Sequence, residues 1–145
     1  MRALEGFAAR ACRAAGLQGC ITVLVTGNRE IQALNVRFRK KKYATDVLSF
    51  PSPGLCDSFA GDIAISVDIA ARNARVLGHS LAEEIRILML HGILHLAGYD
   101  HEADRGEMAR RELALRRKLA LPAALIERSS FSRQRREPLL KRSRV

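Results

Sequence analysis

The sequence predicts an α+β domain, in which helices pack on a small mixed central sheet. Three observations support this fold class. Short β-branched or apolar runs at residues 20–26, 47–50 and 61–66 are typical of strands. Longer segments between and after them show helical spacing of apolar residues, without strict alternation of strand and helix. The chain has 145 residues, which suits one domain with one sizeable core.

The first half of the domain is expected to form a helix, a strand and a second helix. Residues 3–15 have apolar side chains at helical spacing, and Gly16 follows as a terminator. Residues 20–26 form the first strand. Asn28 is a good N-cap for a helix whose apolar face extends to Phe38.

The second half adds two strands and three helices. The strands are expected at 47–50 and 61–66, with a loop at 51–59 between them, and the helices at about 66–77, 80–97 and 103–119. Either Ser66 or Asp68 caps the first of these helices, and Gly78 ends it. Ser80 and Glu83 form a capping box at the start of the second. Beyond Ile87 that helix is apolar on nearly every side, so we expect it in the middle of the domain.

Positive charge is concentrated at the C-terminus. The whole chain carries +10, of which residues 128–145 contribute +6 from seven basic side chains and one acid. We expect residues 1–127 to form the single domain and residues 128–145 to be a tail that is disordered when free. A second basic cluster, Arg37 and residues 39–42, lies inside the domain. Such clusters suit RNA, DNA or an acidic membrane, although a solvated charge run without a partner is the alternative for the tail.

Cysteine usage and hydropathy favour a cytoplasmic protein without a membrane span. The three cysteines, Cys12, Cys20 and Cys56, are odd in number and lack C-x-x-C spacing, so we expect reduced and mostly buried thiols. No apolar run reaches the length of a membrane span. We expect no secretory signal, and residues 2–13 fit an ordinary first helix better than a transit peptide.

The strongest functional signal is a group of three histidines. His91 and His95 are four residues apart, so both project from one face of the central helix. His101 cannot join them on a continuing helix, because six residues rotate a side chain by about 600°. Gly98 can turn the chain back after the helix and allow the following loop to deliver the third imidazole. We therefore expect a metal site on the buried helix and the loop after it.

Three neutral imidazoles suit one Zn²⁺ ion per chain, although other first-row metals also accept them. Three protein ligands leave a fourth position open, as in catalytic zinc sites, where the pKa of coordinated water is about 7. A lone histidine on an apolar helix is usually a packed core residue, but that explanation fits two histidines and a third after a glycine turn poorly. The remaining histidine, His79, is interpreted as a surface residue or a cap.

The histidine spacing equals that of metzincin metalloproteases, which place a glutamate after the first histidine as general base. Gly92 occupies that position here, so this mechanism of peptide hydrolysis lacks its base. A phosphodiester substrate fits better and requires a cation near the metal. Arg39 is one candidate among the basic residues at 37–42, because a guanidinium can bind two phosphate oxygens. Asn35 and Thr45 could bind substrate or simply cap and turn the backbone.

Three segments resemble the YbeY family of bacterial zinc endoribonucleases. They are residues 34–51 with Thr45-Asp46-Val47-Leu48-Ser49-Phe50-Pro51, then Gly61-Asp62-Ile63, then residues 91–101. The resemblance implies an α+β fold, zinc on the three histidines, and single-stranded RNA as substrate. It also implies 3′-end maturation of small-subunit ribosomal RNA and ribosome quality control, with the small subunit or assembly factors as partners and neither DNA nor a membrane.

The resemblance places the family's functional arginine on Arg39 and extends to Tyr99 and Asp100. Asp100 could orient a ligand histidine, or cap the loop. Lys40 is a further candidate for substrate binding. Two features depart from the family: the N-terminus lacks a strand often found before the first helix, so the sheet could be smaller, and the basic tail has no counterpart. Two other functions remain open, a zinc-stabilised ribosome assembly factor that cuts nothing and, with less support, a metalloprotease-like hydrolase.

Overall fold

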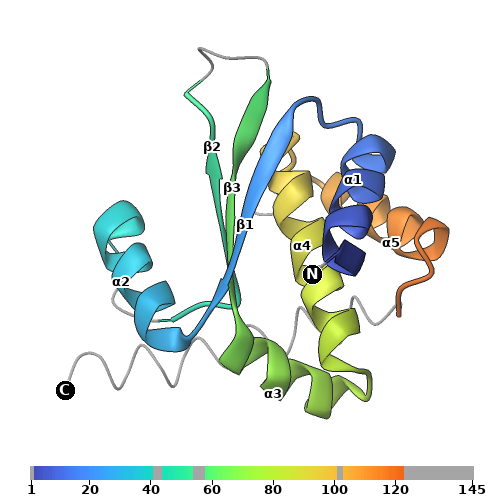
Figure 1. The fold of residues 1–145 in the computed structure, drawn as a ribbon. Coiled ribbons are helices and arrows are strands. Elements are labelled where there is room, and N and C mark those ends of the chain that lie inside the picture. Colours follow the sequence, from blue (N-terminus) through green and yellow to red (C-terminus); the bar gives the residue numbers. More distant parts are fainter. Residues whose placement is uncertain (1, 41–43, 54–57, 101–102, 123–145) are drawn as a thin grey trace.

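The computed structural model describes residues 2–40, 44–53, 58–100 and 103–122 (Figure 1). Within them the elements follow in the order α1 (Arg2–Ala15), β1 (Cys20–Thr26), α2 (Asn28–Arg39), β2 (Val47–Pro51), β3 (Phe59–Ser66), α3 (Val67–Leu77), α4 (Leu81–Leu96) and α5 (Glu107–Lys118). The predicted α+β class is confirmed.

The described strands form a mixed sheet with the order β1-β3-β2. Strand β1 is parallel to β3, with Val23 opposite Ile63, and β2 is antiparallel to β3, with Ser49 opposite the same residue. Figure 1 shows α2 on one side of this sheet and α1, α4 and α5 on the other, with α3 across one end. The strand order places β1 and β2 at the two edges of the described sheet.

Helix α4 is the centre of the main core. Its Ile87, Leu90, Ile93 and Leu94 are each 0 % exposed. They pack with Phe7 and other residues of α1, with the β3 side chains on the same side of the sheet, and with α5. A smaller core of Ile31, Leu48 and Ala64 lies on the α2 side. Burial of α4 on nearly all sides confirms the prediction made from its sequence.

Three helix caps differ in how well the sequence predicted them. The predicted capping box is present, since the Ser80 hydroxyl accepts from the Glu83 N–H at 3.1 Å and the Glu83 carboxylate accepts from the Ser80 N–H at 3.0 Å. Ser66 caps α3 by accepting from Ile69 N–H at 3.1 Å. The prediction that Asn28 caps α2 was wrong: Asn28 lies inside the helix, and its side-chain oxygen accepts from the Ser66 hydroxyl instead.

Three element boundaries differ from those predicted. Helix α5 begins at Glu107 rather than near residue 103, because the Asp104 carboxylate accepts from the N–H groups of Gly106 and Met108 at 2.9 Å and so fixes the first turn. Strand β2 extends to Pro51, which pairs with Gly61, and β3 begins at Phe59. The predicted loop between these strands is therefore shorter.

Burial differs from the prediction at two positions, His79 and Cys20. The side chain of His79 is only 6 % exposed and lies 2.7 Å from a Glu84 carboxylate oxygen, so it is not a surface residue, whereas its backbone N–H does cap α3 by donating to the Ala74 carbonyl at 3.1 Å. Cys20 is exposed, whereas Cys12 is buried as expected. Burial, and next the neighbouring Cys20, raise the pKa of the Cys12 thiol. Cys56 lies outside the described residues.

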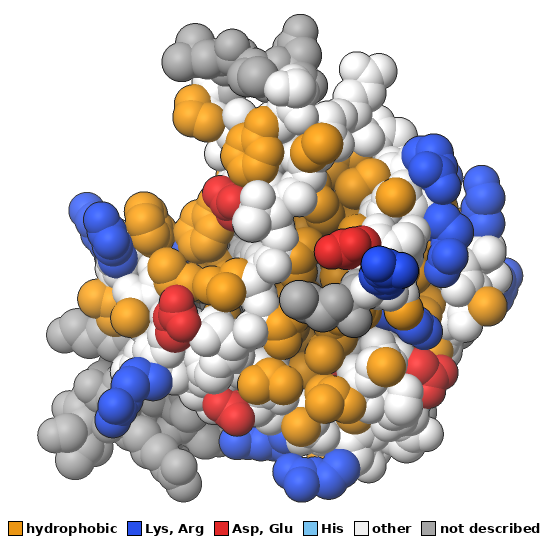
Figure 2. All heavy atoms as spheres, in the orientation of Figure 1, with side chains coloured by type: hydrophobic (Ala, Val, Ile, Leu, Met, Phe, Trp, Pro, Cys, Tyr) orange, Lys and Arg blue, Asp and Glu red, His pale blue; other side chains and the backbone are white. Residues whose placement is uncertain are grey.

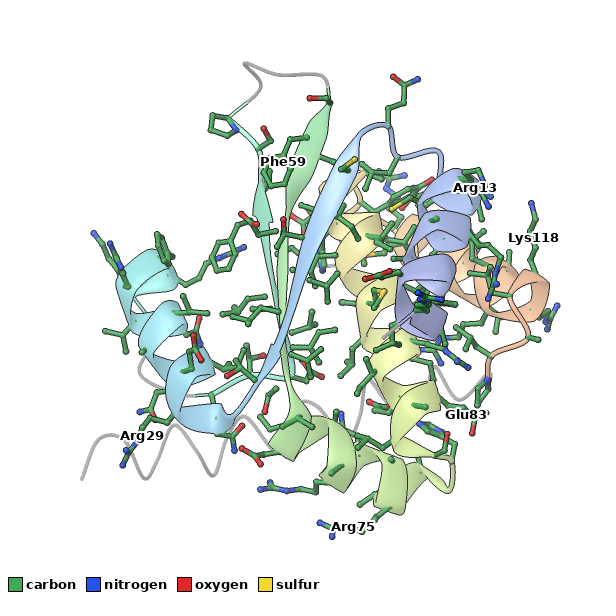
Figure 3. All side chains as sticks on the ribbon, in the orientation of Figure 1. Arg13, Arg29, Phe59, Arg75, Glu83 and Lys118 are labelled. Carbon is green, nitrogen blue, oxygen red and sulfur yellow. The ribbon has the colours of Figure 1, made fainter. Side chains whose placement is uncertain are left out.

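Charged side chains cover the outer faces of the helices. Figure 3 shows Arg29, Arg75, Glu83 and Lys118 directed away from the sheet. On the face shown in Figure 2, apolar side chains gather in the middle and basic ones at the margins. In the described part of the chain, no helix is long and apolar enough to cross a membrane. The predicted tail at 128–145 lies outside the described residues, so its boundary stays a prediction.

Candidate metal centre

His91 and His95 are brought together by one turn of α4. Their Nε2 atoms are 3.2 Å apart, and their rings meet edge-to-face with centroids separated by 4.8 Å. Both rings are partly exposed, although the helix that carries them lies in the middle of the main core. The pair therefore lies where this buried helix reaches the surface.

Each ring is held from behind through its other nitrogen. The Nδ1 of His91 lies 2.8 Å from the Oε1 of Glu112, on α5. The Nδ1 of His95 lies 3.0 Å from the Tyr99 carbonyl oxygen. Glu112 is itself 1 % exposed, and its second oxygen accepts from the guanidinium of Arg116, which is 0 % exposed, at 3.2 Å. Both rings are thus fixed by groups that accept hydrogen bonds.

These contacts decide where the ring protons lie. A carboxylate and a carbonyl accept hydrogen bonds, so in the neutral histidines both Nδ1 atoms carry the proton. Both Nε2 lone pairs then face each other at 3.2 Å, which is favourable only when a cation lies beside them or when one ring also carries a proton on Nε2 and donates it. Two nitrogens bound tetrahedrally to zinc at about 2.0–2.1 Å would be about 3.3 Å apart. The spacing and the donor set of the pair therefore fit a zinc ion.

The turn after α4 completes the support of His95. Gly98 has φ of +101°, in the left-handed region that favours glycine, as predicted. The Gly98 N–H donates to the His95 carbonyl at 3.0 Å and the Tyr99 N–H to the Leu94 carbonyl at 3.1 Å. This turn brings the Tyr99 carbonyl back to the His95 ring. His101, the predicted third ligand, lies outside the described residues and stays a prediction.

Close packing explains why position 92 carries glycine here, whereas metzincins carry glutamate at the corresponding position. It is buried, and a Cβ atom there would lie 2.9 Å from Ile63 Cγ2 and 3.1 Å from Ser49 Oγ. The Ser49 hydroxyl donates to the Gly92 carbonyl at 3.1 Å. This position therefore faces the sheet, and a side chain as large as glutamate does not fit between α4 and β3.

Arg39 contacts β2, the strand that carries Ser49. Its Nη2 donates to the carbonyl oxygen of Ser49, and its guanidinium carbon lies 5.7 Å from the centre of the Phe50 ring. Ser49 in turn contacts α4 at Gly92, next to His91. A short series of contacts thus connects the exposed Arg39 to the histidine pair, whereas the sequence alone did not distinguish it from its basic neighbours.

The other predicted site residues lie in different surroundings. Lys40 is exposed and ends α2 with φ of 56°. The Thr45 hydroxyl donates to the Asp46 carboxylate at 3.4 Å, and the Asp100 carbonyl accepts from Asp104 N–H at 3.0 Å in the turn before α5. Asn35 is 1 % exposed, so its burial disfavours direct contact with substrate. The substrate or ligand-orienting roles of these four residues stay predictions.

Sequence reasoning missed Glu112 and Arg116, the pair that supports His91. A signal for them exists, because both lie on the face of α5 that also carries the buried Met108 and Leu115. An acid and an arginine four residues apart on an apolar helix face indicate a buried ion pair rather than a solvated one. The carbonyl of Tyr99 had no such signal, because a backbone contact leaves no residue type in the sequence.

Comparisons with known proteins agree with this geometry. The family model described as "Endoribonuclease YbeY" matches residues 3–120. A protein named Endoribonuclease YbeY from Koribacter versatilis is 58 % identical over 129 residues, covering 89 % of this chain and 84 % of the relative. Its namesake from Helicobacter pylori is 43 % identical over 109 residues, covering 75 % and 78 %.

A solved structure shares the fold. The solution structure of TM1509 from Thermotoga maritima matches with a TM-score of 0.59 and 29 % identity, covering 81 % of this chain and 79 % of that one. The family model spans most of this chain, including α4 and its two histidines, and the named relatives are similar over three quarters of it or more. The chain therefore belongs to the YbeY endoribonuclease family.

Proposed function

We propose that this chain is a zinc-dependent endoribonuclease that cuts single-stranded RNA at the site built on His91 and His95. The observation that carries the proposal is the convergence of the two Nε2 atoms at 3.2 Å while both Nδ1 atoms are held by acceptors. Membership of a family named for endoribonuclease activity supports RNA as the substrate. His101 is the proposed third ligand, with one ion per chain.

The residues of the chain have distinct roles in this proposal. Glu112 accepts from Nδ1 of His91, and the Tyr99 carbonyl accepts from Nδ1 of His95, so each ring is oriented with its Nε2 toward the proposed metal position. When bound, zinc would supply a Lewis acid for phosphate oxygens and an activated water at neutral pH. Gly92 has no side chain that could act as a base, and its lack of a Cβ atom allows α4 to pack closely against β3.

Arg39 is the proposed phosphate-binding residue. Its contact with the Ser49 carbonyl holds the guanidinium beside β2, and its remaining N–H groups can donate to phosphate oxygens. A guanidinium placed there would stabilise the negative charge that accumulates on phosphate during cleavage. Lys40 follows directly at the end of α2 and adds positive charge for the RNA backbone.

The biological substrate is proposed from the family resemblance. It is the 3′ end of small-subunit ribosomal RNA, cut during maturation and ribosome quality control in the cytoplasm. The small subunit or its assembly factors would then be partners. The main competing function is an assembly factor that binds zinc and RNA but cuts nothing. The metalloprotease-like alternative is disfavoured, because Gly92 cannot be replaced by a base without a clash with Ile63.

A cleavage assay on single-stranded ribosomal RNA tests the proposal. Wild type, chelator-treated protein, His95→Ala and Arg39→Ala would be compared, each prepared free of host nucleases. Arg75→Ala, an exposed arginine of α3, is the matched control for lost charge. We expect cutting by the metal-loaded wild type and the control, and a loss of about 100-fold or more in the other samples. Cutting that survives both chelation and His95→Ala would overturn the proposal.

A further inference from the structure

An exposed aromatic ring lies at the end of α2, beside the proposed phosphate-binding arginine. Phe38 is 55 % exposed, and among the described residues it is the only aromatic residue in the group of exposed large apolar side chains. Its ring meets the half-buried Phe50 ring of β2 edge-to-face, with centroids 5.3 Å apart and an angle of 63° between the planes. Phe50 thus anchors one edge of Phe38, and more than half of the residue's surface remains in contact with solvent.

Two guanidinium groups lie over this pair of rings. The Arg37 guanidinium carbon is 5.2 Å from the Phe38 centroid, and that of Arg39 is 5.7 Å from the Phe50 centroid. Alternating aromatic rings and planar cations form a surface on which a nucleobase can stack, with arginine N–H groups left for the adjacent phosphate. Packing alone explains the position of Phe50, but it does not explain the exposure of Phe38.

The cluster is physically connected to the histidine pair. Phe50 follows Ser49, whose carbonyl accepts from Arg39 and whose hydroxyl donates to the Gly92 carbonyl on α4. Phe38 precedes Arg39 in α2. A nucleotide bound at Phe38 would therefore lie next to the nucleotide whose phosphate Arg39 holds.

We infer that Phe38, supported by Phe50 and flanked by Arg37 and Arg39, is a stacking subsite for one unpaired base of the RNA substrate. This inference rests on the proposed function and adds a physical cause for preference for single strands. A base inside a duplex already stacks on its neighbours and cannot present its face to Phe38, whereas an unpaired base can. Because every base has a π-face, the subsite selects strandedness rather than sequence.

The sequence offers a clean spectroscopic test, because the chain contains no tryptophan. Phe38→Trp introduces one indole at the subsite, and Val76→Trp introduces one at an unrelated position of α3 with a similar exposure of 58 %. Chelator-treated proteins are titrated at low salt with a short single-stranded oligoribonucleotide, with an abasic ribose-phosphate oligomer of equal length, and with an RNA duplex. Chelation keeps the RNA intact.

We expect the single strand to quench the indole at position 38 strongly, and the abasic oligomer and the duplex to quench it far less. The indole at position 76 should respond to none of them. Phe38→Leu should weaken single-strand binding by about 5- to 150-fold, as loss of one base–aromatic stack does, while Val76→Ala leaves it unchanged. Equal quenching by the abasic oligomer, or binding that is unchanged by Phe38→Leu, would overturn the inference.

Failure of the proposed function gives a different pattern. If the chain binds RNA but does not cut it, base-dependent quenching at position 38 persists while metal-loaded wild type leaves ribosomal RNA intact. If the chain cuts RNA but the inference is wrong, zinc-dependent cleavage persists, while the single strand quenches the indole at position 38 no more than the abasic oligomer does. Both readouts use the full chain, and thermal unfolding of Phe38→Leu and Phe38→Trp shows whether each variant folds.

Discussion

The two ends of α4 each hold a histidine next to a glutamate, yet only the C-terminal end carries the histidine pair that we propose as a metal site. At the N-terminal end, His79 Nε2 lies 2.7 Å from Glu84, whose other oxygen accepts from the Asn73 amide at 2.9 Å. At the C-terminal end, His91 Nδ1 lies 2.8 Å from Glu112. The distances are almost equal. The contact itself therefore does not identify a functional histidine.

What distinguishes the two ends is the second ring nitrogen. The second nitrogen of His91 faces that of His95, and its side chain is 26 % exposed, whereas the His79 side chain is 6 % exposed and its glutamate is fully buried. The N-terminal pair ties α3, the following turn and α4 together. At the C-terminal end, the partly exposed His91 ring instead turns its Nε2 toward His95. A histidine–carboxylate contact thus connects elements of the fold at one end, and at the other it orients a ring that we propose as a metal ligand.

Removing the carboxylate charge of Glu112 or of Glu84 should separate the roles of the two ends of α4 most clearly. Glu112→Gln leaves the shape but weakens the acceptor that fixes the His91 proton, so zinc affinity should fall about 10- to 100-fold. Glu84→Gln, the matched change at the other end, should leave zinc affinity unchanged. Competition with a chromophoric chelator measures both. Equal affinities in the two variants would show that Glu112 does not orient the ligand.

His79→Ala should lower the stability of the fold without changing the zinc content. The substitution removes a hydrogen-bond partner from the fully buried Glu84, which should cost about 1–3 kcal/mol in the free energy of unfolding. Denaturant unfolding followed by circular dichroism measures the loss, and metal analysis of the refolded variant should still find one zinc per chain. Loss of zinc from a folded His79→Ala protein would contradict the structural role assigned to this end of α4.

Gly92→Ala tests whether the glycine beside His91 is required by packing. The added Cβ would lie 2.9 Å from Ile63 Cγ2, a methyl group in the core that cannot swing away. We expect a loss of about 1–3 kcal/mol in stability, despite the better helix propensity of alanine. Gly6→Ala in α1, where a Cβ would meet nothing within 4 Å, should instead stabilise the protein by about 0.5–1 kcal/mol. Equal effects of the two substitutions would refute the close-packing argument.

The smallest expected effect concerns the capping box at the N-terminal end of α4. The backbone N–H of Ser80, and next its hydroxyl, hold the pKa of Glu83 below its ordinary value of 4.5. A lowered folded-state pKa means that the ionised Glu83 stabilises the fold above the unfolded-state pKa and loses this effect as pH falls through the folded-state value. Wild type should therefore exceed Glu83→Gln in melting temperature at neutral pH, and the gap should close in acid. A gap independent of pH would contradict this assignment.

The sequence predicted the elements that have strong local signals. Helical periodicity, the Ser80–Glu83 box and the glycines at positions 78 and 98 located α3 and α4 and their ends. It also placed His91 and His95 on one face. The start of α5 was misplaced, because the Asp104 carboxylate that fixes its first turn competes with a helical pattern that begins earlier.

The rest of the site depended on tertiary contacts that no spacing encodes. Glu112 reaches His91 across 21 positions of sequence, and Ser49 reaches Gly92 across 43. His79 was misassigned because its burial depends on Glu84 and on the packing of α3 against α4. Local patterns thus predicted which residues could bind a metal, whereas the groups that orient the His91 and His95 rings became visible only in the fold.

The most direct test is to measure the zinc content of three variants that each lack one histidine, His79→Ala, His91→Ala and His95→Ala. All three are purified in the same buffer and checked for folding. The account predicts one zinc per chain in wild type and in His79→Ala, and almost none in folded His91→Ala and His95→Ala. Full zinc occupancy in His91→Ala and His95→Ala would contradict the account, because the metal would then be bound elsewhere and the paired Nε2 atoms would not be its ligands.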